Sequence, residues 1–141
     1  MNDLIYIILL GILSYLLDIS TAPKNYYSKC IHKTKFHLKL LLHHTIVMFI
    51  FFGWLSNNKY LLIIYAFIPF ILIIHWKTNN NRCIMTEDVN NMCGLDKDEY
   101  IRDFLYIIGF KKTKYYDPFY KAFLLFTFGV VIYKLIYRKS Y

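Results

Sequence analysis

The chain has 141 residues, of which 57% are hydrophobic and 20% aromatic, and its mean hydropathy is +0.36. This composition, with the apolar residues gathered in long blocks, excludes an ordinary soluble domain and favours a membrane protein. The net charge of +8 comes from basic residues that lie between the apolar blocks. Because no run of basic and aromatic residues lies outside those blocks, we expect no nucleic acid partner.

The first apolar block, residues 4–20, predicts a membrane helix that ends near Pro23, because the residue before a proline disfavours the helical conformation. Residues 20–22 resemble a signal-peptide cleavage site. The segment before the block, however, carries Asp3 and no basic residue, whereas a signal peptide begins with positive charge. We therefore expect an uncleaved helix.

Two further blocks, residues 38–56 and 60–76, are each close to the ~20 residues that cross a bilayer. Residues 57–59 join them, which predicts a tight antiparallel hairpin. Pro69 lies inside the third block, where a kink is tolerated if neighbouring helices satisfy the freed carbonyl group.

The last block, residues 119–137, is the weakest span by composition, because Lys121 and Lys134 leave twelve uncharged residues between them. Lysines near both ends of a membrane helix can extend their ammonium groups to the interface. Asp117 and Pro118 suit a helix start, with Asp as the capping residue and Pro at the first helical position. We therefore predict a fourth membrane helix.

The polar stretch 77–118 contains a capping-box pattern at residues 96–99, followed by apolar residues at helical spacing and by Gly109. This pattern predicts an amphipathic helix in the interface plane, with Phe104 and Ile107 facing lipid or the bundle. A helix on the soluble side that packs on the hairpin ends is the alternative. The predicted fold is a single all-α membrane domain, residues 1–141, with about four transmembrane helices and one interfacial helix.

The distribution of Lys and Arg predicts the orientation, since cytosolic loops carry the excess. Five basic residues lie in or beside the first loop and seven in the third, whereas the turn at 57–59 has one and the N-terminus has none. We therefore expect loops 21–37 and 77–118 in the cytosol, facing anionic headgroups, and the N-terminus outside. Three cysteines, at positions 30, 83 and 93, lie in these loops, where a reducing cytosol predicts free thiols.

Three histidines are candidate ligands for a metal ion or haem. His37 and His44 are seven residues apart and share a helix face, and folding the hairpin about Asn58 places Leu41 level with His75. Neutral imidazole is the commonest metal ligand, and haem is often held between histidines of neighbouring helices. His44 and His75 are thus candidate haem ligands, with His37 as a third metal ligand.

The alternative is that these histidines lie at the interface and hydrogen-bond across helices or to headgroups. No His-x-x-x-His or Cys-x-x-Cys spacing supports a metal centre, so we expect no cofactor, and haem or a transition metal is the second possibility. Asp18 is the only acidic residue inside an apolar block. We expect it to reach the interface or to pair with Lys24.

The stretch His75–Glu87, His-Trp-Lys-Thr-Asn-Asn-Asn-Arg-Cys-Ile-Met-Thr-Glu, resembles a pattern in small polytopic membrane proteins of large DNA viruses. Its Cys83-Ile-Met-Thr86 element is also similar to a Cys-Pro-Leu-Thr element in a bacterial family of small membrane proteins of unknown function. That likeness covers residues 36–137, with Ile84 in place of the proline. It implies no known activity, but it implies the same architecture and a polar cap in which His75, Asn80, Cys83 and Thr86 act together.

From the sequence we expect a structural or scaffolding membrane component rather than an enzyme. It would act through helix contacts, as a homo-oligomer or with a membrane protein partner, and through basic loops on anionic headgroups. A haem- or metal-binding redox protein that uses the histidine cluster is the second hypothesis. A small oligomeric channel is the third, although few polar residues run along any one helix.

Overall fold

The computed structural model describes residues 3–80, 82–96, 102, 104–107, 109 and 116–137. Within these residues every regular element is helical, which confirms the all-α prediction. The elements are α1 (Asp3–Thr21), α2 (Thr34–Phe52), the 3-10 helix η1 (Gly53–Leu55), α3 (Lys59–Thr78), α4 (Ile84–Cys93), α5 (Phe104–Ile107) and α6 (Tyr116–Tyr137).

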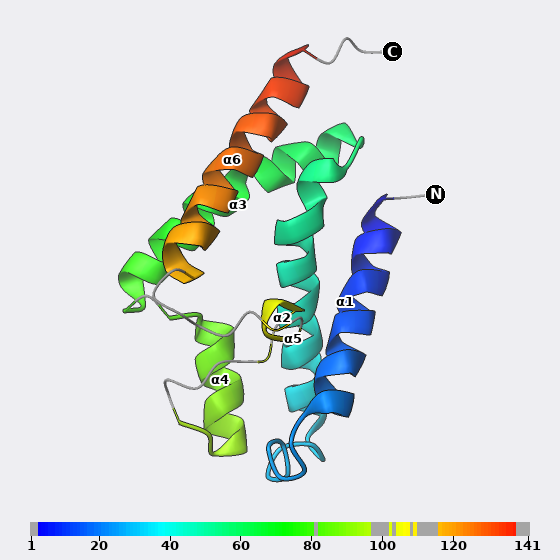
Figure 1. The fold of residues 1–141 in the computed structure, drawn as a ribbon, viewed down its shortest axis with the longest axis vertical. Helices are drawn as coiled ribbons and strands as arrows, with labels where there is room; N and C mark the ends of the chain where they lie inside the picture. Colours follow the sequence, from blue (N-terminus) through cyan, green and yellow to red (C-terminus); the bar gives the residue numbers. More distant parts are fainter. Residues whose placement is uncertain are drawn as a thin grey trace.

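In the described part of the chain, four helices are long and apolar enough to cross a membrane: α1, α2 with η1, α3 and the segment Pro118–Tyr137 of α6. They match the four predicted apolar blocks to within a few residues. Successive long helices run in opposite directions (Figure 1). One end, which we call the turn end, carries the start of α1, η1 and the end of α6. The other end carries residues 22–33 and α4, which we call the platform.

The four long helices form two pairs, because α1 packs mainly on α2 and α3 packs mainly on α6. The predicted tight hairpin of the second and third helices is wrong, since α2 and α3 meet near η1 and then diverge toward the platform (Figure 1). η1 redirects the chain before α3 starts. Gly53 allows this turn, because a Cβ there would lie 2.6 Å from the Phe49 ring and 2.9 Å from the Tyr65 ring.

Polar contacts join the helices at the turn end. The Asp3 carboxylate accepts hydrogen bonds from the Ser56 hydroxyl at 2.5 Å and from the Asn57 backbone N–H at 2.9 Å. The Lys134 ammonium donates to the carbonyl oxygens of Trp54 at 2.9 Å and Ser56 at 3.3 Å. The bonds from Lys134 satisfy carbonyl groups at a helix end, which have no partner within the helix itself. The contacts of Asp3 and Lys134 together tie the start of α1 and the end of α6 to the same turn.

Tyr65 provides a second tie near the turn end. Its hydroxyl donates to the Ile50 carbonyl oxygen at 2.7 Å and lies 2.9 Å from the Thr127 hydroxyl. Tyr65 and Thr127 are fully buried, so this contact links α2, α3 and α6 inside the bundle.

The outer faces of the helices differ from those of a soluble protein. α1, α3 and α6 expose large apolar side chains there, while the interior holds apolar side chains together with polar residues such as Ser14, Asp18, His44 and Thr127. Contiguous apolar surface of this extent is rare on soluble monomers. In a bilayer, by contrast, apolar side chains face lipid, while small and polar residues pack between helices.

The platform contains a helix and a disulfide that we did not predict. α4 ends at Gly94, whose φ of 67° is the left-handed conformation typical of a helix stop. The disulfide joins Cys30 to Cys93, with Cα atoms 4.8 Å apart, and Cys83 is the free cysteine. The expectation of three free thiols is therefore wrong, because α4 lies beside α2 and brings Cys93 to the first loop. The Lys39–Asp88 ion pair also holds α4 to α2.

The predicted amphipathic helix is described only in part, because residues 97–101, 103 and 108 of that prediction lie outside the described residues. The described part contains α5, Phe104–Ile107. α5 sits level with the middle of α2 (Figure 1), and Leu105 is buried among residues of α2 and α6. α5 is thus inserted between the two helical pairs.

The closest approach of α1 and α2 makes a testable prediction. A Cβ at Gly11 would lie 2.5 Å from the Thr45 hydroxyl and 2.7 Å from the Thr45 Cα, so Gly11→Ala requires the helices to move apart. We expect it to lower the free energy of unfolding by about 1–3 kcal/mol, the usual range for overpacking. Gly129→Ala is the matched control, because no atom lies within 4 Å of its added Cβ. Unfolding by detergent titration measures both variants, and equal stabilities would contradict the close packing.

Candidate functional site

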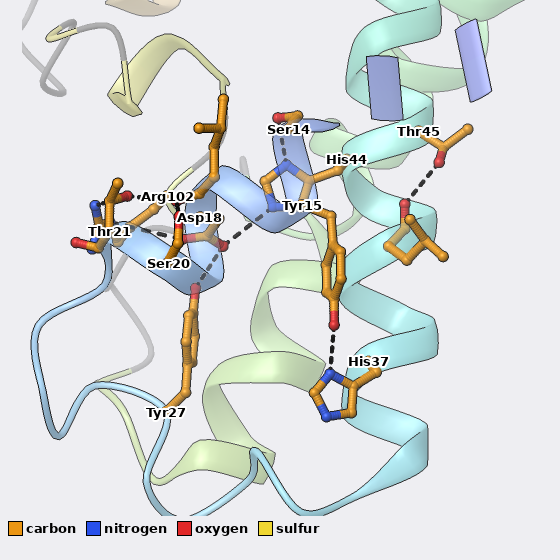
Figure 2. Close-up of polar contacts among 12 residues, drawn as sticks. Ser14, Tyr15, Asp18, Ser20, Thr21, Tyr27, His37, His44, Thr45 and Arg102 are labelled. Carbon is orange, nitrogen blue, oxygen red and sulfur yellow. Dashed lines mark hydrogen bonds and ion pairs between the residues drawn. The ribbon is translucent and has the colours of Figure 1, made fainter. Parts of the chain in front are cut away.

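The most polar part of the interior lies where α1 meets α2 near the platform. Ile7, Gly11, Ser14 and Asp18 are the buried residues of α1, and their spacing places them on one helix face toward α2. Ser14 and Asp18 meet His44 of α2, Tyr27 of the first loop and Arg102, which comes just before α5 (Figure 2). We call Ser14, Asp18, Tyr27, His44 and Arg102 the Asp18 cluster.

His44 bridges the two α1 residues of the cluster. Its Nε2 lies 3.2 Å from an Asp18 carboxylate oxygen, and its Nδ1 lies 2.9 Å from the Ser14 hydroxyl. A carboxylate only accepts hydrogen bonds, so Nε2 carries a proton and donates it. In the neutral ring, Nδ1 then accepts from Ser14. Both ring nitrogens of His44 are therefore in use.

Tyr27 and Arg102 complete the surroundings of Asp18. The Tyr27 hydroxyl donates to Asp18 at 2.8 Å. Burial and the Asp18 carboxylate raise the pKa of Tyr27 above its usual value, so this hydroxyl keeps its proton and remains a donor. The Arg102 guanidinium donates to the Thr21 carbonyl oxygen at 2.7 Å and to the Thr21 hydroxyl at 2.9 Å. Its Nε lies 3.7 Å from the second Asp18 oxygen.

The cluster balances one buried negative charge against one buried positive charge. Asp18 is fully buried and the Arg102 side chain is 11% exposed, so neither charge is well solvated. Burying an ion costs several kcal/mol unless an opposite charge and hydrogen bonds compensate it. Within the described residues, Asp18 Oδ1 and Arg102 Nε have no hydrogen-bond partner, and they lie 3.7 Å from each other, at ion-pair distance. The earlier expectation that Asp18 reaches the interface or pairs with Lys24 is wrong.

A contact between a tyrosine and a histidine lies closer to the platform. The Tyr15 hydroxyl lies 2.7 Å from His37 Nδ1 (Figure 2). His37 Nε2 lies 2.6 Å from the Ile31 carbonyl oxygen. Since a carbonyl only accepts, Nε2 donates and Nδ1 accepts from Tyr15. His37 thus ties α1 and the first loop to the start of α2.

His75 holds the start of α4. Its Nε2 accepts from the Ile84 backbone N–H at 3.1 Å, one of the donors that a helix start leaves without a partner. Asn79 lies beside it and donates to the Arg82 carbonyl oxygen at 3.1 Å and to the Glu87 carboxylate at 3.0 Å. These contacts form a polar connection between α3 and α4.

The residues predicted as a polar cap lie around this connection. Asn80 adopts a left-handed conformation with φ 50°, which turns the chain toward α4. Cys83 precedes α4, and its carbonyl oxygen accepts from the Glu87 backbone N–H at 3.1 Å. Thr86 lies in the first turn of α4. Among the described residues, the side-chain hydrogen bonds of this connection involve His75, Asn79 and Glu87. Asn79 and Glu87 were not predicted as members of the cap.

The three histidines predicted as metal ligands each contact a different part of the protein. His44 lies in the Asp18 cluster, His37 bonds Tyr15, and His75 bonds α4, and each uses at least one ring nitrogen that a metal would need. Among the residues that the structure describes, no three His, Cys, Asp or Glu side chains are arranged to hold a metal ion. Haem or metal binding by these histidines stays a prediction that these contacts do not favour.

The Asp18 cluster makes a testable prediction about stability. Asp18→Asn keeps the shape of the side chain but leaves the buried Arg102 charge uncompensated. Breaking a buried pair in this way costs about 3–5 kcal/mol, and we expect a loss of that order in a detergent unfolding titration.

The matched control is Asp88→Asn, which removes the half-exposed partner of Lys39. Exposed pairs contribute about 0–1 kcal/mol. Similar losses of unfolding free energy for the two variants would show that Asp18 stabilises the fold no more than an exposed ion pair does.

The residue types Ser14, His44 and Asp18 are those of a hydrolytic triad, but the arrangement does not suit that chemistry. In a triad the serine faces Nε2 and the aspartate faces Nδ1, and here the nitrogens are exchanged. Ser14 is also only 2% exposed, so no substrate reaches its hydroxyl. The cluster instead joins α1, α2, the first loop and Arg102.

Comparisons with protein-family models, with curated proteins and with solved structures found no match.

Proposed function

We propose that this chain is a structural component of a membrane, a four-helix unit that carries a basic polar platform on one side. The observation that supports it best is the apolar outer surface: large apolar residues cover the outer faces of α1, α3 and α6, while polar groups buried between the helices bond one another. A protein of this kind acts through its shape and its surfaces. The interior polar groups are occupied in holding the helices.

Basic residues in and beside the first loop support anionic headgroups as the partner of the platform. Lys24, Lys29 and Lys35 are exposed, and they lie in or beside the loop that joins α1 to α2. Each basic side chain near an anionic membrane surface contributes about 1 kcal/mol of attraction. The platform is thus suited to lie against headgroups.

The proposed orientation places the platform in the cytosol and the turn end outside. Twelve of the seventeen Lys and Arg residues lie in or beside the first and third loops, and this excess is what orients a chain during insertion. The Cys30–Cys93 disulfide weighs against this orientation, because disulfides are rare in the cytosol. We give the charges more weight, since they act while the helices insert. The disulfide sulfurs are buried and therefore shielded from soluble thiols after folding.

Two exposed asparagines at opposite ends test the orientation. In a Cys83→Ser background, a maleimide that cannot cross membranes should modify Asn57→Cys in intact cells. Asn25→Cys should react only after the membrane is permeabilised. Asn57 is preferable to Asn58, whose side chain caps α3. The reverse pattern would place the platform and its disulfide in an oxidising compartment.

An absorption spectrum and metal analysis of detergent-purified protein test the structural role against redox chemistry. We expect no haem band and well below one metal per chain, because His37, His44 and His75 already bond protein groups. A haem band or a stoichiometric metal that disappears in His44→Ala but persists in the exposed His32→Ala variant would instead establish a cofactor site.

A further inference from the structure

The four long helices lie closest together at the turn end. Asp3, at the start of α1, accepts a hydrogen bond from the Ser56 hydroxyl. Lys134, near the end of α6, donates to the carbonyl oxygens of Trp54 and Ser56. α3 begins at Lys59, directly after this turn. One short turn therefore gathers an end of each of the four long helices.

At the platform the same helices separate into two pairs. α1 stays packed on α2 and α3 stays packed on α6, but α2 and α3 move apart after η1 (Figure 1). α4 lies beside α2 and beyond the end of α3, so a further helix adds to the width of the molecule at this end. The described helices thus occupy a wider cross-section at the platform than at the turn end.

Bonds at both ends of α4 hold this wide end open. At its start, the Ile84 backbone N–H donates to His75 of α3 at 3.1 Å. At its end, the Cys30–Cys93 disulfide joins α4 to the first loop, beside α2. A bilayer that pressed the two pairs together at the platform would have to displace α4 and break one of these bonds. The difference in width between the two ends is therefore stiff.

The polar side chains of α4 place it at the level of the headgroups. Glu87 and Asp88 are partly exposed and Asn91 is exposed, and a charged side chain is costly within the hydrocarbon core. Val89 and Cys93, on the opposite side of α4, are buried in the apolar cluster that includes residues of α2. The added width therefore lies on the platform side of the bilayer, in one leaflet.

A membrane protein that is wider in one leaflet displaces unequal areas of lipid from the two sides. In a flat bilayer the lipids of the two leaflets must then pack unequally around it. In a curved bilayer the convex leaflet has the larger area and can accept the wider end. Bilayer deformation around a protein has a modest cost, but that cost is enough to sort proteins between membranes.

We propose that this wedge shape makes the protein favour strongly curved bilayers, with the platform on the convex face. The partner is thus a membrane surface of a stated shape, such as the wall of a narrow tubule. The inference rests on the structural role in a membrane proposed above, and it names the kind of membrane. It requires neither anionic lipid nor a particular orientation in the cell.

Membrane tubes pulled from giant vesicles of phosphatidylcholine test the proposal. This lipid has no net charge, so attraction between the basic loop and the headgroups is removed. The full chain, in a Cys83→Ser background, is reconstituted in both orientations. An impermeant fluorescent maleimide added outside then labels Asn25→Cys molecules whose platform faces outward, or Asn57→Cys molecules whose turn end faces outward. Both positions are exposed, and the disulfide cysteines do not react.

The measured quantity is the fluorescence per membrane area in the tube divided by that in the vesicle, as the tube is narrowed. The outer face of a tube is convex, so this ratio should rise above unity for labelled Asn25→Cys and fall below unity for labelled Asn57→Cys. The two samples share one fold, one dye and one lipid, so each is the control for the other. Equal ratios, or a reversed difference, would overturn the proposal. Failure of the structural role is a separate result, because a cofactor would appear in the absorption spectrum whatever the tubes show.

Discussion

A carboxylate held away from water is tolerated only where neighbouring groups supply hydrogen bonds and positive charge. Asp18 imposes this requirement on the platform half of the fold. His44 meets it from α2, Tyr27 from the first loop and Arg102 from the segment before α5. Parts of the chain that are far apart in the sequence therefore meet at one point on α1. The contacts of Tyr27 and Arg102 with Asp18 position the first loop and the start of α5.

The rest of the architecture follows from the absence of a hydrophobic driving force between helices in lipid. Helices there associate by close packing and by hydrogen bonds. Both are visible: Gly11 admits Thr45 at the α1–α2 contact, and Tyr65 and Thr127 meet between α3 and α6. The two helical pairs diverge because η1 turns the chain, so the space between them has to be filled by another element. The insertion of Leu105 fills it.

The four long helices could be predicted because length and apolarity alone determine them. Asp18 was the one acidic residue in an apolar block, and that signal marked the centre of the site. Its partners could not be found, because Tyr27 and Arg102 come from loops whose path depends on the packed structure. The histidines were considered as candidate metal or haem ligands because a straight hairpin would bring His44 and His75 to a similar depth, whereas α2 and α3 diverge. The disulfide was not predicted, because the pairing of Cys93 with Cys30 depends on how α4 packs beside α2.

Three kinds of interaction hold the fold together: hydrogen bonds, a disulfide and a buried ion pair. Neutral and charge-assisted hydrogen bonds close the turn end, where Lys134 binds carbonyl groups. A covalent bond between Cys30 and Cys93 closes the platform. Between them, the ion pair of Asp18 and Arg102 positions α5. Of these three links, the middle one depends on a balance of two buried charges. It is therefore the link that a change of charge at Asp18 or Arg102 would disturb most.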